Sequence, residues 1–141
     1  MRVRLIAFLV LVVGVVPAVS LAAGSATTKL EATFSGKTEV PKAGNGKGTA
    51  DITITGAKVC WEFKVSGIDT PLAAHIHKGG AGKAGPVVVP LGAKYTAKGC
   101  TTATAALAKA IAAQPAAYYV NVHTKKYPAG AVRGQLKKQT Y

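Results

Sequence analysis

The residues of this chain best suited to chemistry are its three histidines, which lie in two short segments. The first, residues 74–79, contains His75-Ile76-His77, and the second, residues 119–124, contains His123. Both segments alternate as β-strands do, and residues two apart on a strand point to the same side of the sheet. If Ile76 and Val122 pack into a core, all three imidazoles point away from it. Three neutral imidazoles with an open coordination position suit copper(II) or zinc, whereas iron and manganese usually take a carboxylate as well.

Polar side chains accompany the histidines on the same side of the predicted strands. With alternate residues facing the core, Tyr119, Asn121 and Arg133 join the imidazoles, and we expect them to surround the ligands. Asn121 or a backbone carbonyl could hold the second ring nitrogen of a ligand. The alternative is a cluster of imidazoles that only hydrogen-bonds backbone or turn groups. The sequence leaves both interpretations open.

Catalysis by nucleophilic side chains has little support in the sequence. The serines at 25, 35 and 66 lie in no G-x-S-x-G context. Hydrolysis by paired carboxylates would depend on the five acids, of which Asp51 and Glu62 are predicted on the solvated faces of strands. We therefore expect a binding protein rather than an enzyme.

The N-terminal stretch predicts a secretory signal. Arg2 and Arg4 precede an uncharged apolar run from 5 to 16, and small residues follow it. The run is shorter than the roughly 20 residues that span a bilayer, so a membrane anchor is disfavoured. Cleavage after Ala22 or Ala23 would leave one domain, residues 24–141, without a transmembrane span. We expect this domain to be secreted or extracytoplasmic, in the periplasm or the cell envelope.

Two cysteines remain, Cys60 and Cys100. In an oxidising compartment an even count favours pairing, and we predict a Cys60–Cys100 disulfide. A metal–thiolate site and two free thiols are the alternatives. Neither cysteine belongs to a C-x-x-C motif.

The chain is strongly basic, with a formal charge of +13, and all five acids precede Thr70. A positive surface attracts polyanions, so an envelope polyanion or an extracellular protein is a possible partner. The lysines are scattered and are not interleaved with aromatic residues, which argues against specific nucleic-acid binding. We favour solubility and protection of edge strands as their role.

Alternating apolar residues predict a mostly β domain. On the strand 58–66, Trp61 and Phe63 are expected to anchor the core while Cys60 faces outward. One helix is predicted from Ala105 to Ala113, capped by one of the preceding threonines and followed by Pro115. The other strands are expected at 28–35, 49–55, 74–79, 87–91, 117–124 and 131–137.

Four motifs follow one another along the predicted domain: HIHKG at 75–79, GPVVVPL at 85–91, YYVNVHT at 118–124 and PAGAVRGQL at 128–136. In this order and with this spacing, they resemble the CHRD domain, a family named after chordin that also occurs as single-domain exported bacterial proteins. The resemblance covers nearly the whole predicted domain. Many members carry an acid just before the last strand, where this chain has Ala131, which makes the local field more positive.

The CHRD family is in turn similar to the copper/zinc superoxide dismutases. This similarity implies an all-β fold: an immunoglobulin-like or superoxide dismutase-like antiparallel β-sandwich with one short helix. His75 and His77 match the His-x-His pair that holds copper in those enzymes, and His123 approximately matches a later histidine ligand. Arg133 approximately matches an anion-guiding arginine. The bridging histidine and the zinc ligands have no counterpart here.

These observations predict an extracytoplasmic binding module that holds a transition metal through His75, His77 and His123. Copper is the expected ion and zinc the second choice. A protein-interaction or envelope-associated module without metal is one alternative. A superoxide dismutase-like copper enzyme is the other.

Overall fold

The structure is a computed structural model that describes residues 24 and 26–140; the secretory signal predicted at 1–23 lies outside the described residues. The elements are β1 (Thr27–Ser35), η1 (Gly36–Thr38), β2 (Lys47–Thr55), β3 (Lys58–Ser66), β4 (Pro71–Lys78), β5 (Val87–Pro90), β6 (Lys98–Thr102), α1 (Ala105–Ala113), η2 (Pro115–Ala117), β7 (Tyr118–Thr124), β8 (Val132–Gln135) and β9 (Lys137–Lys138).

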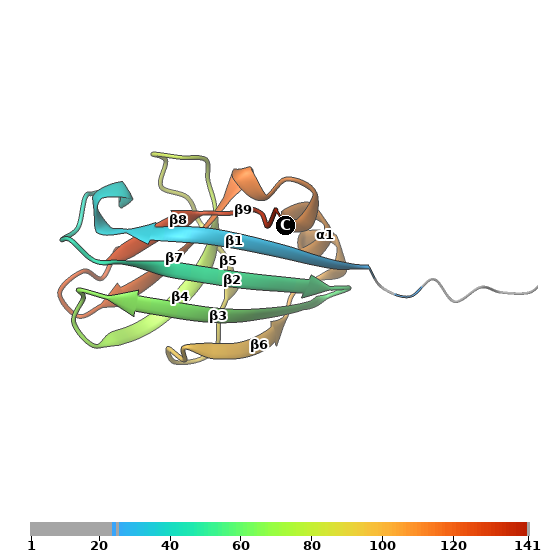
Figure 1. The fold of residues 1–141 in the computed structure, drawn as a ribbon, viewed down its shortest axis with the longest axis horizontal. Helices are drawn as coiled ribbons and strands as arrows, with labels where there is room; N and C mark the ends of the chain where they lie inside the picture. The colour runs from blue at the N-terminus through green and yellow to red at the C-terminus, as the bar shows by residue number, and fades with distance from the viewer. Residues whose placement is uncertain (1–23, 25, 141) are drawn as a thin grey trace, which may run out of the picture.

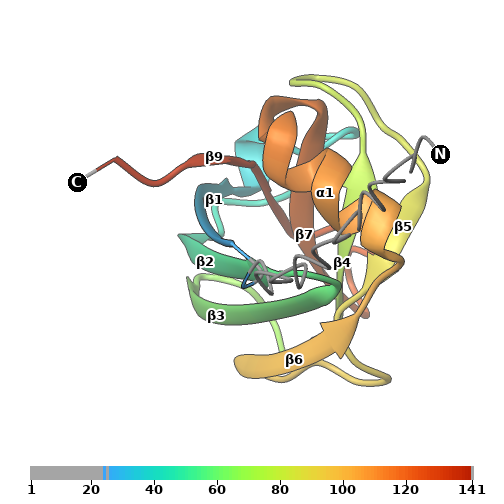
Figure 2. The same ribbon diagram turned by 90° about the vertical axis from the view of Figure 1, so that its right-hand side faces the viewer.

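The strands form one antiparallel sheet in the order β5-β4-β7-β8-β1-β2-β3-β6, and β9 pairs with β1. The sheet bends between β1 and β8, whose backbones pair at only one position, Ser35 with Arg133. One layer therefore contains β1, β2, β3 and β6, and β4, β7 and β8 lie behind it (Figure 1). The view along the strands shows the two layers edge-on (Figure 2). The predicted antiparallel β-sandwich with one short helix is confirmed.

The core lies between the layers, because alternate residues of each strand face inward. β2 and β3 pair along nine residues each, which sets Ala50 opposite Phe63 and Ile52 opposite Trp61. All four are buried. The rings of Phe34 and Phe63 meet edge to face with their centroids 5.6 Å apart. The prediction that Trp61 and Phe63 of the strand 58–66 anchor the core is confirmed.

Helix α1 covers one end of the sandwich (Figures 1 and 2). The hydroxyl of Thr104 accepts the N–H of Leu107 at 3.2 Å and so caps the helix, as one of the preceding threonines was expected to do. Ala108 and Ile111 are fully buried against the core. The helix has the predicted bounds, and Pro115 begins the short turn η2 that follows. Within the described part of the chain, no helix is long and apolar enough to cross a membrane.

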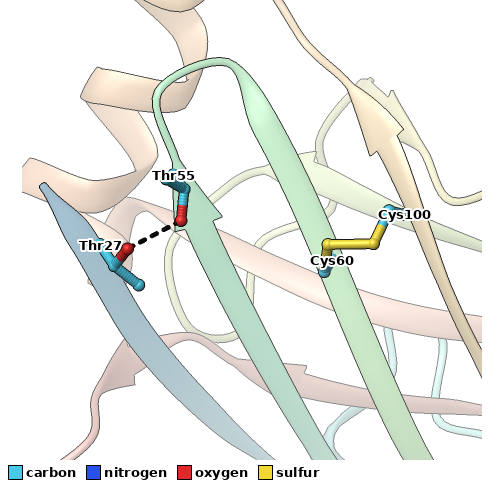
Figure 3. The surroundings of a disulfide bond; sticks show 4 residues. All are labelled: Thr27, Thr55, Cys60 and Cys100. Atoms are coloured by element: carbon cyan, nitrogen blue, oxygen red, sulfur yellow. Dashed lines mark hydrogen bonds between the residues drawn. A yellow bond between two sulfur atoms is a disulfide. The ribbon is translucent and has the colours of Figure 1, made fainter. Parts of the chain in front are cut away.

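Strand β6 was not predicted, because its five residues carry no large apolar side chain. It pairs with β3 and sets Cys100 directly opposite Cys60. The predicted disulfide joins these residues and ties β6 to the outer side of the sheet (Figure 3). On the other side of β3, the hydroxyls of Thr27 in β1 and Thr55 in β2 form a hydrogen bond of 2.9 Å between these two strands (Figure 3).

The largest differences from the predicted strand bounds are in β4 and in the last strand. β4 begins at Pro71, three residues before the predicted start. The predicted last strand is divided into β8 and β9 at Leu136, whose side chain is buried in the core. The division lets β9 pair with the other half of β1, opposite Leu30 and Glu31.

Candidate metal centre

The pairing of β4 with β7 places the three histidines on one face. Ile76 and Val122 are completely buried in the core, so their neighbours point to the other side of the layer. In the register of the two strands, His75 is opposite Asn121 and His77 is opposite Tyr119, while His123 is opposite Ala73. The predicted common face of the three imidazoles is confirmed.

The imidazoles converge. His75 Nδ1 and His123 Nε2 are 2.9 Å apart, and one candidate ligand nitrogen from each of the three rings lies within 4.8 Å of the others. The ring centroids are 4.8 Å apart for His75 and His123, 5.7 Å for His75 and His77, and 6.0 Å for His77 and His123. The nitrogens therefore share a common focus that could hold a metal.

Backbone carbonyls fix the tautomers of two of these rings. His77 Nδ1 lies 2.8 Å from Gly85 O, and His123 Nδ1 lies 2.9 Å from Pro128 O. A carbonyl oxygen only accepts, so each Nδ1 carries the proton and each Nε2 has its lone pair directed away from the carbonyl. In the metal-free protein, His123 Nε2 accepts the Nδ1 proton of His75, which an ion would have to displace. The Nε2 atom of His77 is buried and has no hydrogen-bond partner among the described residues. An unpartnered buried nitrogen of this kind is suited to bind an ion.

The surroundings keep the imidazoles neutral. Burial, followed by repulsion from His123 and His77, lowers the pKa of His75 to about 4. Burial also lowers the pKa of His77 and of His123, although the hydrogen bonds to Gly85 and Pro128 oppose the shift. Neutral imidazole is the form that binds metal, so all three rings are in the ligand form at neutral pH.

A stack of side chains holds the His77 ring in place. The ring of Tyr119 stacks on His77 with centroids 4.8 Å apart and an interplanar angle of 13°. The guanidinium carbon of Arg133 lies 3.4 Å from the centroid of the Tyr119 ring. Since β4 and β8 flank β7 on opposite sides, Tyr119 is held between the imidazole and the guanidinium. Arg133 is only 2% exposed.

The glycine-rich segment 79–85, which joins β4 to β5, folds over this stack. Arg133 donates to Gly80 O at 2.9 Å and to Lys83 O at 2.8 Å. The hydroxyl of Tyr119 accepts the N–H of Gly85 at 3.1 Å. The same segment thus covers the polar face and supplies the carbonyl that orients His77.

The site lies within a stretch with a recognisable family pattern. Residues 30–136 match the CHRD domain, and this range contains all three histidines and both cysteines. The chain belongs to the CHRD domain family. Comparisons with curated proteins and with solved structures found no match.

One acid of this CHRD domain lies beside Arg133 and was not predicted there. Glu39, in the segment after η1, is only 4% exposed. Its carboxylate packs against Gly130, so a Cβ at that glycine would collide with it. Burial raises the pKa of Glu39 to about 7, although the charge of Arg133 and hydrogen bonds from Val40 and Asn121 lower it. An acid from another part of the chain therefore moderates the positive field expected beside Ala131.

Asn121 does not have the role first considered for it. We expected its side chain or a backbone carbonyl to hold a ligand's second nitrogen, and carbonyls do so for His77 and His123. Asn121 instead donates to Ala129 O at 3.3 Å, and its Oδ1 has no partner among the described residues. It lies beside His77, where it favours the protonated imidazole.

Of the predicted surrounding residues, the structure therefore brings Tyr119 and Asn121 to His77 directly and Arg133 through Tyr119. Glu39 was not predicted at the site, and the expected backbone carbonyl could not be assigned to Gly85 or Pro128 from the sequence. A backbone acceptor leaves no mark in a sequence. Glu39 reaches the site through a contact distant in sequence, and no local pattern around it could have revealed this.

Proposed function

We propose that this CHRD domain is an extracytoplasmic copper-binding module whose ligands are His75, His77 and His123. One observation carries the proposal: three neutral imidazole nitrogens converge, and one of them, His77 Nε2, is buried without a partner. The carbonyls of Gly85 and Pro128 support it, because they hold the proton on Nδ1 of two rings and leave Nε2 as the nitrogen that can bind an ion.

The order of metal affinities favours copper(II) over zinc. Three neutral imidazoles with an open coordination position suit either ion. His75 Nδ1 and His123 Nε2 are joined by a hydrogen bond of 2.9 Å in the metal-free protein, so their separation does not distinguish the two ions. Divalent copper binds nitrogen ligands more tightly than zinc does. We therefore place zinc second.

The proposed location follows from the cysteines and the N-terminal sequence. The Cys60–Cys100 disulfide suits an oxidising compartment, and the residues 1–23 have the pattern of a secretory signal. A metal-binding domain of this kind, residues 24–141, would buffer or hand on copper in the periplasm or the cell envelope.

The test is calorimetric titration of the untagged mature protein with copper(II) and, separately, with zinc. We expect one copper per chain, bound more tightly than zinc. The electron paramagnetic resonance spectrum of the copper-loaded protein should show nitrogen hyperfine structure. Acetylating the N-terminus serves as a control, because a free amine can bind copper by itself, and it should leave the stoichiometry unchanged.

The variants separate the histidine cluster from other sites. His75→Gln should weaken copper binding, and the triple His75→Ala/His77→Ala/His123→Ala variant should abolish it. Circular dichroism establishes that both variants are folded. Copper binding that is absent from the native protein, or unchanged in a folded triple variant, refutes the proposal. The imidazoles would then only hydrogen-bond one another and the backbone, and the domain would be an interaction module without metal.

A further inference from the structure

A cavity of about 480 Å³ lies on the outer side of the sheet, where β1 and β8 part. Its floor is formed by Thr33 of β1 with Gly134 and Gln135 of β8, and its walls come from segments distant in sequence. Those segments are 37–42, the tip of the glycine-rich loop at 81 and 82, and Lys137 of β9. The volume is in the range of small-molecule sites, about 300–1,000 Å³.

The division of the last strand creates this cavity. β8 leaves β1 after the pair of Ser35 with Arg133, and β9 rejoins β1 at Glu31. A Cβ at Gly134 would lie 2.7 Å from Thr33 O, so the two chains remain close at the floor. The opening is therefore part of the folded sheet and lies between two points where strands pair.

The cavity is strongly cationic. Lys37, Lys42, Lys137 and Arg133 line it, and Glu39 is the one acid among its lining residues. Lys137 pairs with Glu31 at 3.0 Å. Lys37 and Lys42 are exposed and form no ion pair with any other described residue. Their charges are therefore available to a ligand.

Arg133 and Glu39, the two buried charged residues of the cavity, do not neutralise the positive charges of Lys37 and Lys42. The guanidinium of Arg133 is occupied by the carbonyls of Gly80 and Lys83, which do not neutralise its charge. Burial raises the pKa of Glu39 to about 7, so this acid is largely protonated below neutral pH. The residues facing Glu39 are Arg133 and Asn121, and the lysines at 37, 42 and 137 share its cavity.

We propose that this cavity binds a phosphate-bearing anion with two or more charges, held by Lys37 and Lys42. Ammonium groups bind phosphate oxygens through short, charge-assisted hydrogen bonds. The hydroxyl of Thr33, which lines the floor, adds a neutral donor. The site uses none of the three histidines and is independent of the copper proposal.

The test is calorimetric titration with tripolyphosphate at low salt. The double variant Lys37→Gln/Lys42→Gln should bind it at least about tenfold more weakly, because two charge-assisted contacts are lost. The matched control is Lys94→Gln/Lys109→Gln, which removes the same charge at two exposed lysines outside the cavity. Equal weakening in both double variants means general attraction without a site and overturns the proposal, as does the absence of binding.

The Glu39→Gln variant tests whether the anion binds in this cavity, because Glu39 is the acid that lines it. At pH 8, where the native acid is ionised, this variant should bind tripolyphosphate more tightly than the native protein, and at pH 5.5 the two should converge. Binding no tighter at pH 8 contradicts the location. A parallel titration with inorganic phosphate distinguishes the source: equal affinity indicates the free ion, and a preference for tripolyphosphate indicates a phosphate chain.

The copper site and the anion site can be tested independently of each other. The Lys37→Gln/Lys42→Gln variant should keep its copper affinity, and the triple histidine variant should keep its affinity for tripolyphosphate. A histidine variant that is folded but no longer binds tripolyphosphate would place the anion at the histidine cluster and overturn the cavity assignment.

Discussion

At the scale of single residues, the site is organised by carbonyl oxygens rather than by carboxylates. Gly85 and Pro128 each accept the Nδ1 proton of one histidine, which fixes the tautomer without adding charge. The imidazoles consequently remain neutral and crowded. Burial is the largest cause of the lowered pKa at all three rings.

This crowding predicts an acid-sensitive contribution to stability. The pKa of His75 falls from 6.5 in the unfolded chain to about 4 in the fold, so the unfolded chain binds the proton first as pH falls. The metal-free protein should therefore lose stability between pH 6.5 and pH 4, and His75→Gln should lose less over the same range. Urea unfolding with a chelator present, at pH 7 and pH 4.5, measures both. Identical pH dependences would show that His75 makes no such contribution.

Glu39 should act in the opposite direction. Its pKa is raised from 4.5 in the unfolded chain to about 7 in the fold, so its contribution to stability is complete below pH 4.5 and is lost as pH rises from 4.5 to 7. We expect Glu39→Gln to raise the free energy of unfolding at pH 8 by about 1–3 kcal/mol. The gain should be mostly gone at pH 4.5, where the native acid is protonated in the fold and half protonated in the unfolded chain. Thermal unfolding at the two pH values is the check, and a loss of stability at pH 8 would contradict it.

At the scale of elements, β6 depends on a glycine under an aromatic ring. Gly99 is paired with Trp61, and a Cβ there would lie 2.5 Å from Trp61 Cζ2. The indole N–H of Trp61 donates to Thr96 O at 2.9 Å, which limits its movement. The strand therefore has little freedom to accept a side chain at this position.

We expect Gly99→Ala to lower the free energy of unfolding by about 1–3 kcal/mol, the usual cost of overpacking. Gly80→Ala is the matched control, since nothing lies within 4 Å of its Cβ position and its φ is not in the left-handed region. Urea unfolding of both variants compares them directly. Equal stability of the two variants would show that Trp61 moves aside.

The strands also show which parts of the fold and of the site can be predicted from the sequence. The alternation of apolar residues predicted β2 and β3, because their inward side chains are apolar. β6 has no such alternation, because it contains only small and polar residues. The common face of His75, His77 and His123 followed from the period of a strand. Glu39 and the acceptor carbonyls were beyond reach, because each depends on where a distant loop crosses the sheet.

At the scale of the whole molecule, the disulfide acts on the layer that carries no histidine. Cys60 and Cys100 are 40 residues apart in the sequence, for which chain entropy gives a stabilisation of about 4 kcal/mol. We expect the Cys60→Ala/Cys100→Ala variant to lose up to this amount in urea unfolding. The histidines belong to β4 and β7, so copper affinity should be unchanged while the variant is folded. A parallel loss of copper affinity would show that the layers are coupled.

The single pair that joins β1 to β8 also has a consequence for the order of folding. β1, β2 and β3 form a meander whose pairings are close in sequence, whereas Ser35 and Arg133 meet only after a long loop has closed. The meander should therefore be formed in the transition state, and the seam with β8 afterwards. Stopped-flow kinetics test this: Ile52→Val should slow refolding, and Val132→Ala should mainly speed unfolding. The reverse pattern would mean that the second layer nucleates the fold.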